Sequence, residues 1–75
     1  MVYLDVRTKS EYDEGHYDNA IHHDLALITQ GVLPNIEKDA EIHAYCRSGN
    51  RSEMAKEILI KHGFTNVKNI GGFKW

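Results

Sequence analysis

The single cysteine of the chain, Cys46, stands in the segment best suited to carry out chemistry. It follows the segment Glu41-Ile42-His43-Ala44-Tyr45, which predicts a strand, and it precedes a polar loop, residues 47–51, that leads into a predicted helix. In open α/β sheets, ligands bind beyond the carboxyl ends of the strands. The unpaired N–H groups at the start of a helix attract anions. A thiol placed between these two features is expected to ionise readily and to act as a nucleophile.

The loop after Cys46 has a composition that suits a nest of backbone N–H groups. Gly49 and Asn50 are residue types that tolerate positive φ angles at low cost. A loop that contains them can turn several N–H groups toward one anionic atom. The alternative is structural, namely a buried cysteine at a strand end followed by an ordinary Ser-Gly-Asn turn. The residues of the loop alone leave both interpretations open.

Charge is distributed unevenly along the 75 residues, although the formal net charge is only −2. Residues 1–44 carry three basic and nine acidic side chains, whereas residues 45–75 carry six basic and two acidic ones. The basic half contains Cys46, and a positive local field favours a thiolate and attracts a small anion. Chance segregation in a short chain would explain the same pattern.

The elements that must position Cys46 alternate between strands and helices. We expect strands near residues 1–4, 20–21, 41–45 and 67–70. We expect short helices between Thr8 and Gly15, over residues 25–28 up to Gly31, and over residues 52–62, with Gly63 as an αL C-cap. The first of these helices should begin with a capping box, because Thr8 and Glu11 have the required spacing. The third helix places four apolar residues on one face: Met54, Ala55, Ile58 and Leu59. This order predicts an α/β domain, a compact, small, open and largely parallel sheet flanked by short helices.

Length and composition exclude several classes of protein. A chain of 75 residues makes one domain at most, and a hydrophobic fraction of 41% excludes a disordered composition. One cysteine excludes an internal disulfide and a Cys-rich zinc site. No run approaches the ~20 apolar residues that a membrane span needs. The absence of an apolar leader favours the cytoplasm, and removal of a signal peptide would place the chain in the periplasm.

The histidines and aromatic residues do not indicate a metal or nucleic-acid site. None of the five histidines has an i, i+4 partner of the kind that forms a helical metal pair, so we expect no metal. The aromatic residues do not alternate with basic ones, so we expect no nucleic-acid partner. Core or edge packing is the expected role of Tyr3, Tyr45, Phe64, Phe73 and Trp75.

The order of motifs along the chain resembles that of rhodanese-like domains. The most specific motif is the loop Cys46-Arg47-Ser48-Gly49-Asn50-Arg51, which Tyr45 precedes and Ser52 follows. The other matching segments are Asp5-Val6-Arg7, Glu11-Tyr12, Gly15-His16, Ala20-Ile21, Gly63 to Val67, and Gly71-Gly72 to Trp75. The resemblance extends over essentially the whole chain and is greatest to small single-domain, phage-shock-protein-E-like sulfurtransferases.

The resemblance implies a reaction and a role for each matching residue. Cys46 would be the nucleophile that takes a sulfane sulfur from a donor such as thiosulfate, as a persulfide, and passes it to cyanide or a thiol. The active-site loop that stabilises the anionic sulfur would consist of Arg47, Ser48, Gly49, Asn50 and Arg51.

Within that loop, Arg47 and Arg51 would bind or steer the anionic donor, and Ser48 would donate to the persulfide. Asp5 and Arg7 would support the site from behind, with Arg7 paired to an acid. The alternative interpretation of Asp5 and Arg7 is that they are ordinary surface charges at the end of a strand. No metal or organic cofactor is implied.

The resemblance also sets expectations about partners and extent. We expect a small anionic sulfur donor and a cyanide or thiol acceptor, with a thioredoxin-like protein as one candidate, and no nucleic-acid or membrane partner. We expect a monomer or a weak homodimer. Residues 1–75 would form one rhodanese-like domain that is short at both ends, because family members usually have further elements on either side.

Two other functions fit the same fold. One is a non-catalytic rhodanese-like module that binds or regulates another protein. The other is a phosphatase or arsenate reductase of the related fold, whose loop typically places an arginine six positions after the cysteine. Here Arg51 stands five positions after Cys46, which suits sulfur better than a tetrahedral oxyanion.

Overall fold

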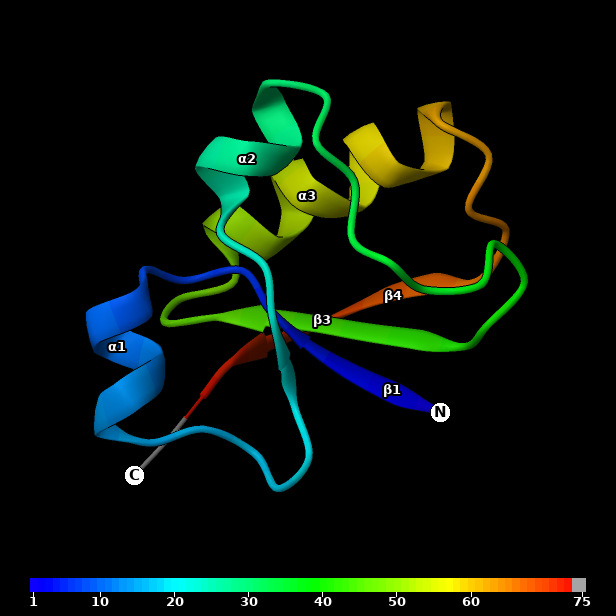
Figure 1. Cartoon of the computed structure of the whole chain (residues 1–75). Coiled ribbons are helices and arrows are strands. Elements are labelled where there is room, and N and C mark those ends of the chain that lie inside the picture. Colours follow the sequence, from blue (N-terminus) through cyan, green and yellow to red (C-terminus); the bar gives the residue numbers. More distant parts are fainter. Residues whose placement is uncertain (74–75) are drawn as a thin grey trace.

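A computed structural model describes residues 1–73 of the chain, and within them four strands form one parallel sheet. The spatial order of the strands is β2-β1-β3-β4, so that β1 and β3 are central (Figure 1). In chain order the elements are β1 (Val2–Asp5), α1 (Lys9–Glu14), β2 (Ile21–His22), α2 (Leu25–Thr29), β3 (Ile42–Cys46), α3 (Asn50–Lys61) and β4 (Val67–Gly72). The expected α/β class with a compact, open, parallel sheet and short flanking helices is confirmed.

The two faces of the sheet have different coverings. Helices α2 and α3 lie over one face, and α1 lies beside the carboxyl ends of the strands (Figure 1). Successive strand residues point to opposite faces, so Ile42, Ala44 and Cys46 of β3 join the core beneath α2 and α3. Tyr45 and its neighbour Tyr3 on β1 face the other way, and their rings meet edge to face. The cysteine therefore belongs to the face that α3 covers.

The ends of the helices follow the local signals in the sequence. The Thr8 side chain accepts from the Glu11 backbone N–H, and the Glu11 carboxylate accepts from the Thr8 N–H, which completes the expected capping box of α1. Gly63 follows α3 with a φ of 97°, the left-handed conformation expected at that position.

The structure corrects the predicted face of α3 and its starting point. The helix begins at Asn50, so Asn50 is helical, and of the two residues proposed for positive φ only Gly49 has it, at 98°. Met54 was predicted to face the core, but it is 51% exposed. The buried stripe instead runs through Ser52, Ala55 and Leu59, because α3 packs with Ser52 beside the Cys46 sulfur at the end of β3 and with Ala55 and Leu59 in the core.

Strand β4 is longer than predicted and reaches Gly72. Ala44 pairs with Asn69 but Cys46 pairs with Gly72, so a bulge opposite Tyr45 shifts the register. Bulges of this kind are frequent next to active sites, where they re-aim the strand. Trp75, predicted as a packing residue, lies outside the described residues. None of the helices in residues 1–73 has the length and apolar character needed to cross a bilayer.

Candidate active site

Cys46 is the last residue of β3 and lies beneath the loop that leads into α3. Its side chain is fully buried. The N–H of Gly49 donates to the Cys46 Sγ atom at 2.9 Å. Gly49 can make this contact because its left-handed backbone reverses the chain directly before α3. The loop thus aims at least one backbone donor at the sulfur, as the sequence predicted for a nest.

The hydrogen bonds around Cys46 favour its thiolate. Burial alone raises the pKa of Cys46, but donors from Ser52, Gly49 and Ser48 outweigh it, and the pKa falls from 9.0 to about 7. The positive end of the α3 dipole acts in the same direction. A pKa near neutrality makes the thiolate, the reactive form of cysteine, accessible at ordinary pH.

Ser52 is a site residue that the sequence analysis quoted in a motif but gave no role. Its hydroxyl lies 3.5 Å from the Cys46 Sγ atom and is buried. Ser48, which was expected to donate to the sulfur from its side chain, is exposed, and its hydroxyl oxygen faces the Asn50 N–H at 3.5 Å. The structure therefore places the Ser52 hydroxyl nearer to the sulfur, and Ser48 lowers the thiol pKa through its backbone.

The end of β4 packs against the loop and leaves no room for a side chain at one position. The N–H of Phe73 donates to the Cys46 carbonyl oxygen at 2.7 Å. A Cβ atom at Gly72 would overlap the carbonyl oxygen of Arg47. Gly72 is therefore required for the approach of β4 to the active-site loop.

Arg51 is tied to α1 by a bidentate ion pair. Its guanidinium donates to the two Glu11 carboxylate oxygens at 2.7 and 3.0 Å. The hydrogen bond from Arg51 lowers the pKa of Glu11 to about 2, against its partial burial. Glu11 was predicted only as a capping residue, and its pairing with a residue 40 positions later had no local signal. Arg47, by contrast, is exposed at the surface of the loop.

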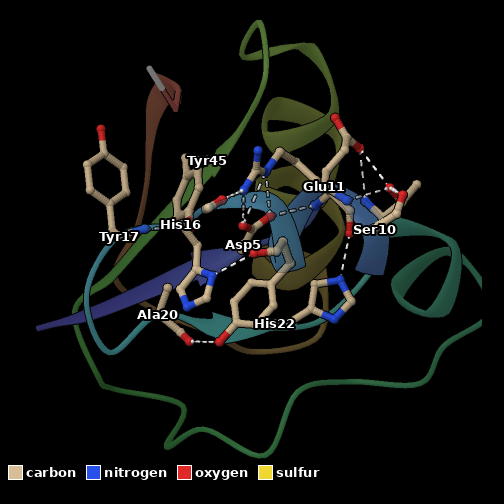
Figure 2. A network of polar contacts seen from close by, with 12 residues as sticks. Asp5, Ser10, Glu11, His16, Tyr17, Ala20, His22 and Tyr45 are labelled. Atoms are coloured by element: carbon tan, nitrogen blue, oxygen red, sulfur yellow. Dashed lines mark hydrogen bonds and ion pairs between the residues drawn. The ribbon is translucent and has the colours of Figure 1, made fainter. Parts of the chain in front are cut away.

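Asp5 and Arg7 form an ion pair in the interior of the protein. Their side chains are 0% and 1% exposed, and Arg7 Nη2 lies 2.7 Å from Asp5 Oδ2. Arg7 also donates to the carbonyl oxygen of Gly15 and lies against the ring of Tyr45. Figure 2 shows Asp5 and Tyr45 within one network of polar contacts that extends to Glu11. The alternative of exposed strand-end charges is wrong, and the role of the pair in supporting the site stays a prediction.

The histidines make structural hydrogen bonds. His16, His22 and His23 each place a ring nitrogen within 2.8 Å of a backbone carbonyl oxygen. Among residues 1–73, no three side chains of the His, Cys, Asp and Glu types lie together in a way that could hold a metal ion.

Comparison with known proteins agrees with the motifs and with the fold. The family described as "Rhodanese-like domain" matches residues 1–75. The chain belongs to the rhodanese-like domain family. The thiosulfate sulfurtransferase PspE of Escherichia coli is 34% identical to this rhodanese-like chain over 73 residues, which cover 96% of the chain and 70% of PspE.

Two further similarities show how widely this rhodanese-like fold is used. The adenylyltransferase and sulfurtransferase UBA4 of Candida glabrata is 36% identical over 81 residues, which cover 95% of the chain but 19% of UBA4. The solved structure described as a rhodanese with anions from E. coli superimposes with a TM-score of 0.84 at 33% identity and covers 95% of the chain and 85% of that protein. The chain thus corresponds to most of PspE but to only a small part of UBA4.

Proposed function

We propose that the chain is a sulfurtransferase in which Cys46 carries the transferred sulfur as a persulfide. The observation that supports this proposal most directly is the set of hydrogen-bond donors around Cys46, from Gly49, Ser52 and Ser48. These donors lower the pKa of the buried thiol to about 7. Relatives that are named as sulfurtransferases, PspE and UBA4, support the same reaction class.

The first step forms the persulfide. The Cys46 thiolate attacks the outer sulfur of a donor, for which thiosulfate is the simplest candidate. A new S–S bond forms, the bond inside thiosulfate breaks, and its electron pair leaves with sulfite. The negative charge then rests on the terminal sulfur, where the N–H groups of residues 47–51 and the start of α3 would stabilise it.

The second step returns the thiolate. A nucleophilic acceptor, cyanide or a thiolate, attacks the terminal sulfur, and the electron pair of the broken S–S bond returns to Cys46. With cyanide the product is thiocyanate, and with a thiol it is a new persulfide. A protein thiol of the thioredoxin-like kind is one candidate acceptor.

The two arginines near the loop would serve different purposes. Arg47 is exposed, so its charge can attract an anionic donor from solution. Arg51 is already bound to Glu11, so it would act mainly by holding the start of α3. Because Cys46 has no exposed surface, a donor reaches the sulfur only when the surrounding chain moves.

Intact-mass measurement after incubation with thiosulfate tests the proposal. The chain should gain the mass of one sulfur atom, cyanide should remove it, and Cys46→Ala should not gain it. A folded protein that never forms this adduct with thiosulfate or with an organic persulfide would contradict the proposal and favour a binding module. Hydrolysis of a phenyl phosphate without any response to sulfur donors would favour a phosphatase.

A further inference from the structure

The side chain of Asn69, on β4, connects this strand to the start of α3. Its Oδ1 atom accepts from the Ser52 hydroxyl at 2.6 Å and from the Gly71 N–H at 3.0 Å. Its Nδ2 atom donates to the Gly49 carbonyl oxygen and to a Glu53 carboxylate oxygen, both at 3.0 Å. A carboxamide has two N–H donors and two acceptor sites, so all of them are occupied.

These partners also fix the orientation of the Asn69 carboxamide. The Gly71 N–H can only donate, so it must face Oδ1. The Gly49 carbonyl oxygen can only accept, so it must face Nδ2. If the amide were rotated by half a turn, Oδ1 would face two acceptors, the Gly49 carbonyl and the Glu53 carboxylate, and Nδ2 would face the Gly71 N–H, which is a donor. The observed orientation is therefore the favourable one.

Two of the partners of Asn69 are residues that hydrogen-bond to the sulfur. Gly49 directs its N–H to Cys46 Sγ while Asn69 holds its carbonyl oxygen. Ser52 lies 3.5 Å from the sulfur but only 2.6 Å from Asn69 Oδ1. Asn69 itself makes no hydrogen bond to the sulfur and acts through these two neighbours.

The Ser52 hydroxyl has one hydrogen and three acceptors around it, namely Asn69 Oδ1 at 2.6 Å, the Gly49 carbonyl oxygen at 3.1 Å and Cys46 Sγ at 3.5 Å. The contact to Asn69 is the shortest of the three. A charged sulfur is a stronger acceptor than a neutral thiol, so we expect the hydroxyl to donate to Cys46 once the thiol has lost its proton. Asn69 Oδ1 then keeps the Gly71 N–H as its donor.

We propose that Asn69 is a positioning residue that sets the reactivity of Cys46 by holding Gly49 and Ser52 as its hydrogen-bond donors. The inference rests on the proposed role of Cys46 as nucleophile and adds a residue that neither the loop motif nor the family resemblance indicated. The arrangement is specific to the tertiary fold, because the bulge in β4 directs the backbone of Gly71 back to Asn69.

Charged groups near this cluster must be separated from the effect of Asn69. Arg51 of α3 interacts electrostatically with Cys46, and Glu11 of α1 neutralises it. Glu53 of α3 accepts directly from Asn69. The buried pair of Asp5, the last residue of β1, and Arg7, two residues later, lies on the Tyr45 side of the sheet. The variants below leave all of these side chains unchanged.

The first experiment titrates the thiol without any sulfur donor. The ultraviolet absorbance of the thiolate is followed against pH, and the profile of Cys46→Ala is subtracted to remove tyrosine. Asn69→Ala should raise the midpoint by about one pH unit, the equivalent of one hydrogen bond. Asn69→Asp should raise it further, because a carboxylate cannot donate to Gly49 and adds negative charge.

Asn66→Ala and Asn66→Asp are the matched controls. Asn66 is exposed and directly precedes β4, at the end of the sheet opposite to Cys46. Both controls should leave the midpoint unchanged. Folded Asn69 variants with the same midpoint as the parent chain would overturn the proposal.

A second measurement needs no substitution at Asn69 and serves if those variants do not fold. In the parent chain, the side-chain NH₂ resonances of Asn69 should shift with the same midpoint as the Cys46 titration, and should not shift in Cys46→Ala. Resonances that do not respond to ionisation of the thiol would overturn the proposal. Since neither measurement uses a sulfur donor, a failure here is distinct from a failure to form the persulfide.

Discussion

At the scale of single residues, Cys46 is reactive because of the groups that surround its sulfur. Cysteine in an apolar interior is normally inert, since burial opposes ionisation. Here the N–H of Gly49 and the hydroxyl of Ser52 outweigh that effect, and the pKa of the thiol falls to about 7. The reactivity is therefore sensitive to changes of a single hydrogen bond.

The rate of persulfide formation should follow the ionisation of Cys46. The thiol pKa is lowered, so the thiolate forms as the pH rises through about 7, and the rate with thiosulfate should rise to a plateau above that value. Ser52→Ala should move the midpoint upward by about one unit. Single-turnover measurements by quenching and mass spectrometry give this profile. Ser10→Ala, on the exposed surface of α1, is the control. A rate that still rises steeply beyond pH 9 would contradict the assignment.

The two loop arginines should have separable effects. Arg47→Ala should slow the reaction with thiosulfate about tenfold at low salt, because it removes an exposed charge that attracts the anion. A neutral donor, such as an organic trisulfide, should be used almost as well as before. Arg51→Ala should slow both donors alike, because it releases α3 from Glu11. An equal loss for both donors in Arg47→Ala would argue against an anion-binding role.

At the scale of elements, the site depends on the close approach of β4 to the loop after β3. The register shift between Ala44 and Cys46 brings Gly72 opposite the cysteine, and Phe73 donates to the Cys46 carbonyl oxygen. Helix α3 contributes its first turn, and α1 contributes Glu11. Helix α1 and strand β4, which are distant from β3 in sequence, therefore meet β3 and α3 at the carboxyl end of β3.

Gly72→Ala should disrupt the site more than it disrupts the fold. The added methyl group would overlap the carbonyl oxygen of Arg47, so β4 or the loop must move. Persulfide formation should fall at least about tenfold, since donors held by the loop lose their alignment. Gly31→Ala is the control for adding a methyl group to a glycine, because nothing lies within 4 Å of the added atom, although Gly31, unlike Gly72, has a positive φ of 83°. Activity in Gly72→Ala equal to that in Gly31→Ala would show that the contact is unimportant.

At the scale of the whole molecule, the 75 residues bury a complete ion pair, Asp5–Arg7, although their hydrophobic core is small. A domain of this size buries only ~60% of the surface that its unfolded chain exposes. The Asp5–Arg7 pair lies on the sheet face opposite to α2 and α3, where Tyr45 packs against it. Its geometry is therefore important for stability, because one partner without the other would be a buried, uncompensated charge.

Asp5→Asn should reduce the free energy of unfolding by about 3–5 kcal/mol, because Arg7 would remain buried without its counter-charge. Such a loss is large against the ~5–15 kcal/mol typical of a folded domain. Urea denaturation measures it. Asp13→Asn is the matched control: Asp13 pairs with Lys9 on the surface, with side chains 55% and 76% exposed, and should change stability by less than about 1 kcal/mol. Equal effects of the two substitutions would contradict the buried-pair assignment.

Most of the fold could be predicted from local patterns. The capping box at Thr8, the glycine after α3 and the alternation of elements are encoded within a few residues, and the structure confirms them. Met54 was wrongly predicted to face the core, because the apolar periodicity of α3 does not show that the polar residue Ser52 lies on the buried side. That side is decided by how the start of α3 packs, where the left-handed turn at Gly49 lies against Gly71 of β4.

The sequence by itself determined that a lone cysteine ends a strand and precedes a glycine-containing loop and a helix, which is enough to indicate a thiolate site. Only the tertiary structure decided which groups surround the sulfur. Ser52 and Asn69 meet there, and Glu11 binds Arg51 beside it, because of the strand register and the packing of helices on the sheet. Such contacts join residues up to 40 positions apart, and no periodicity or local propensity specifies them.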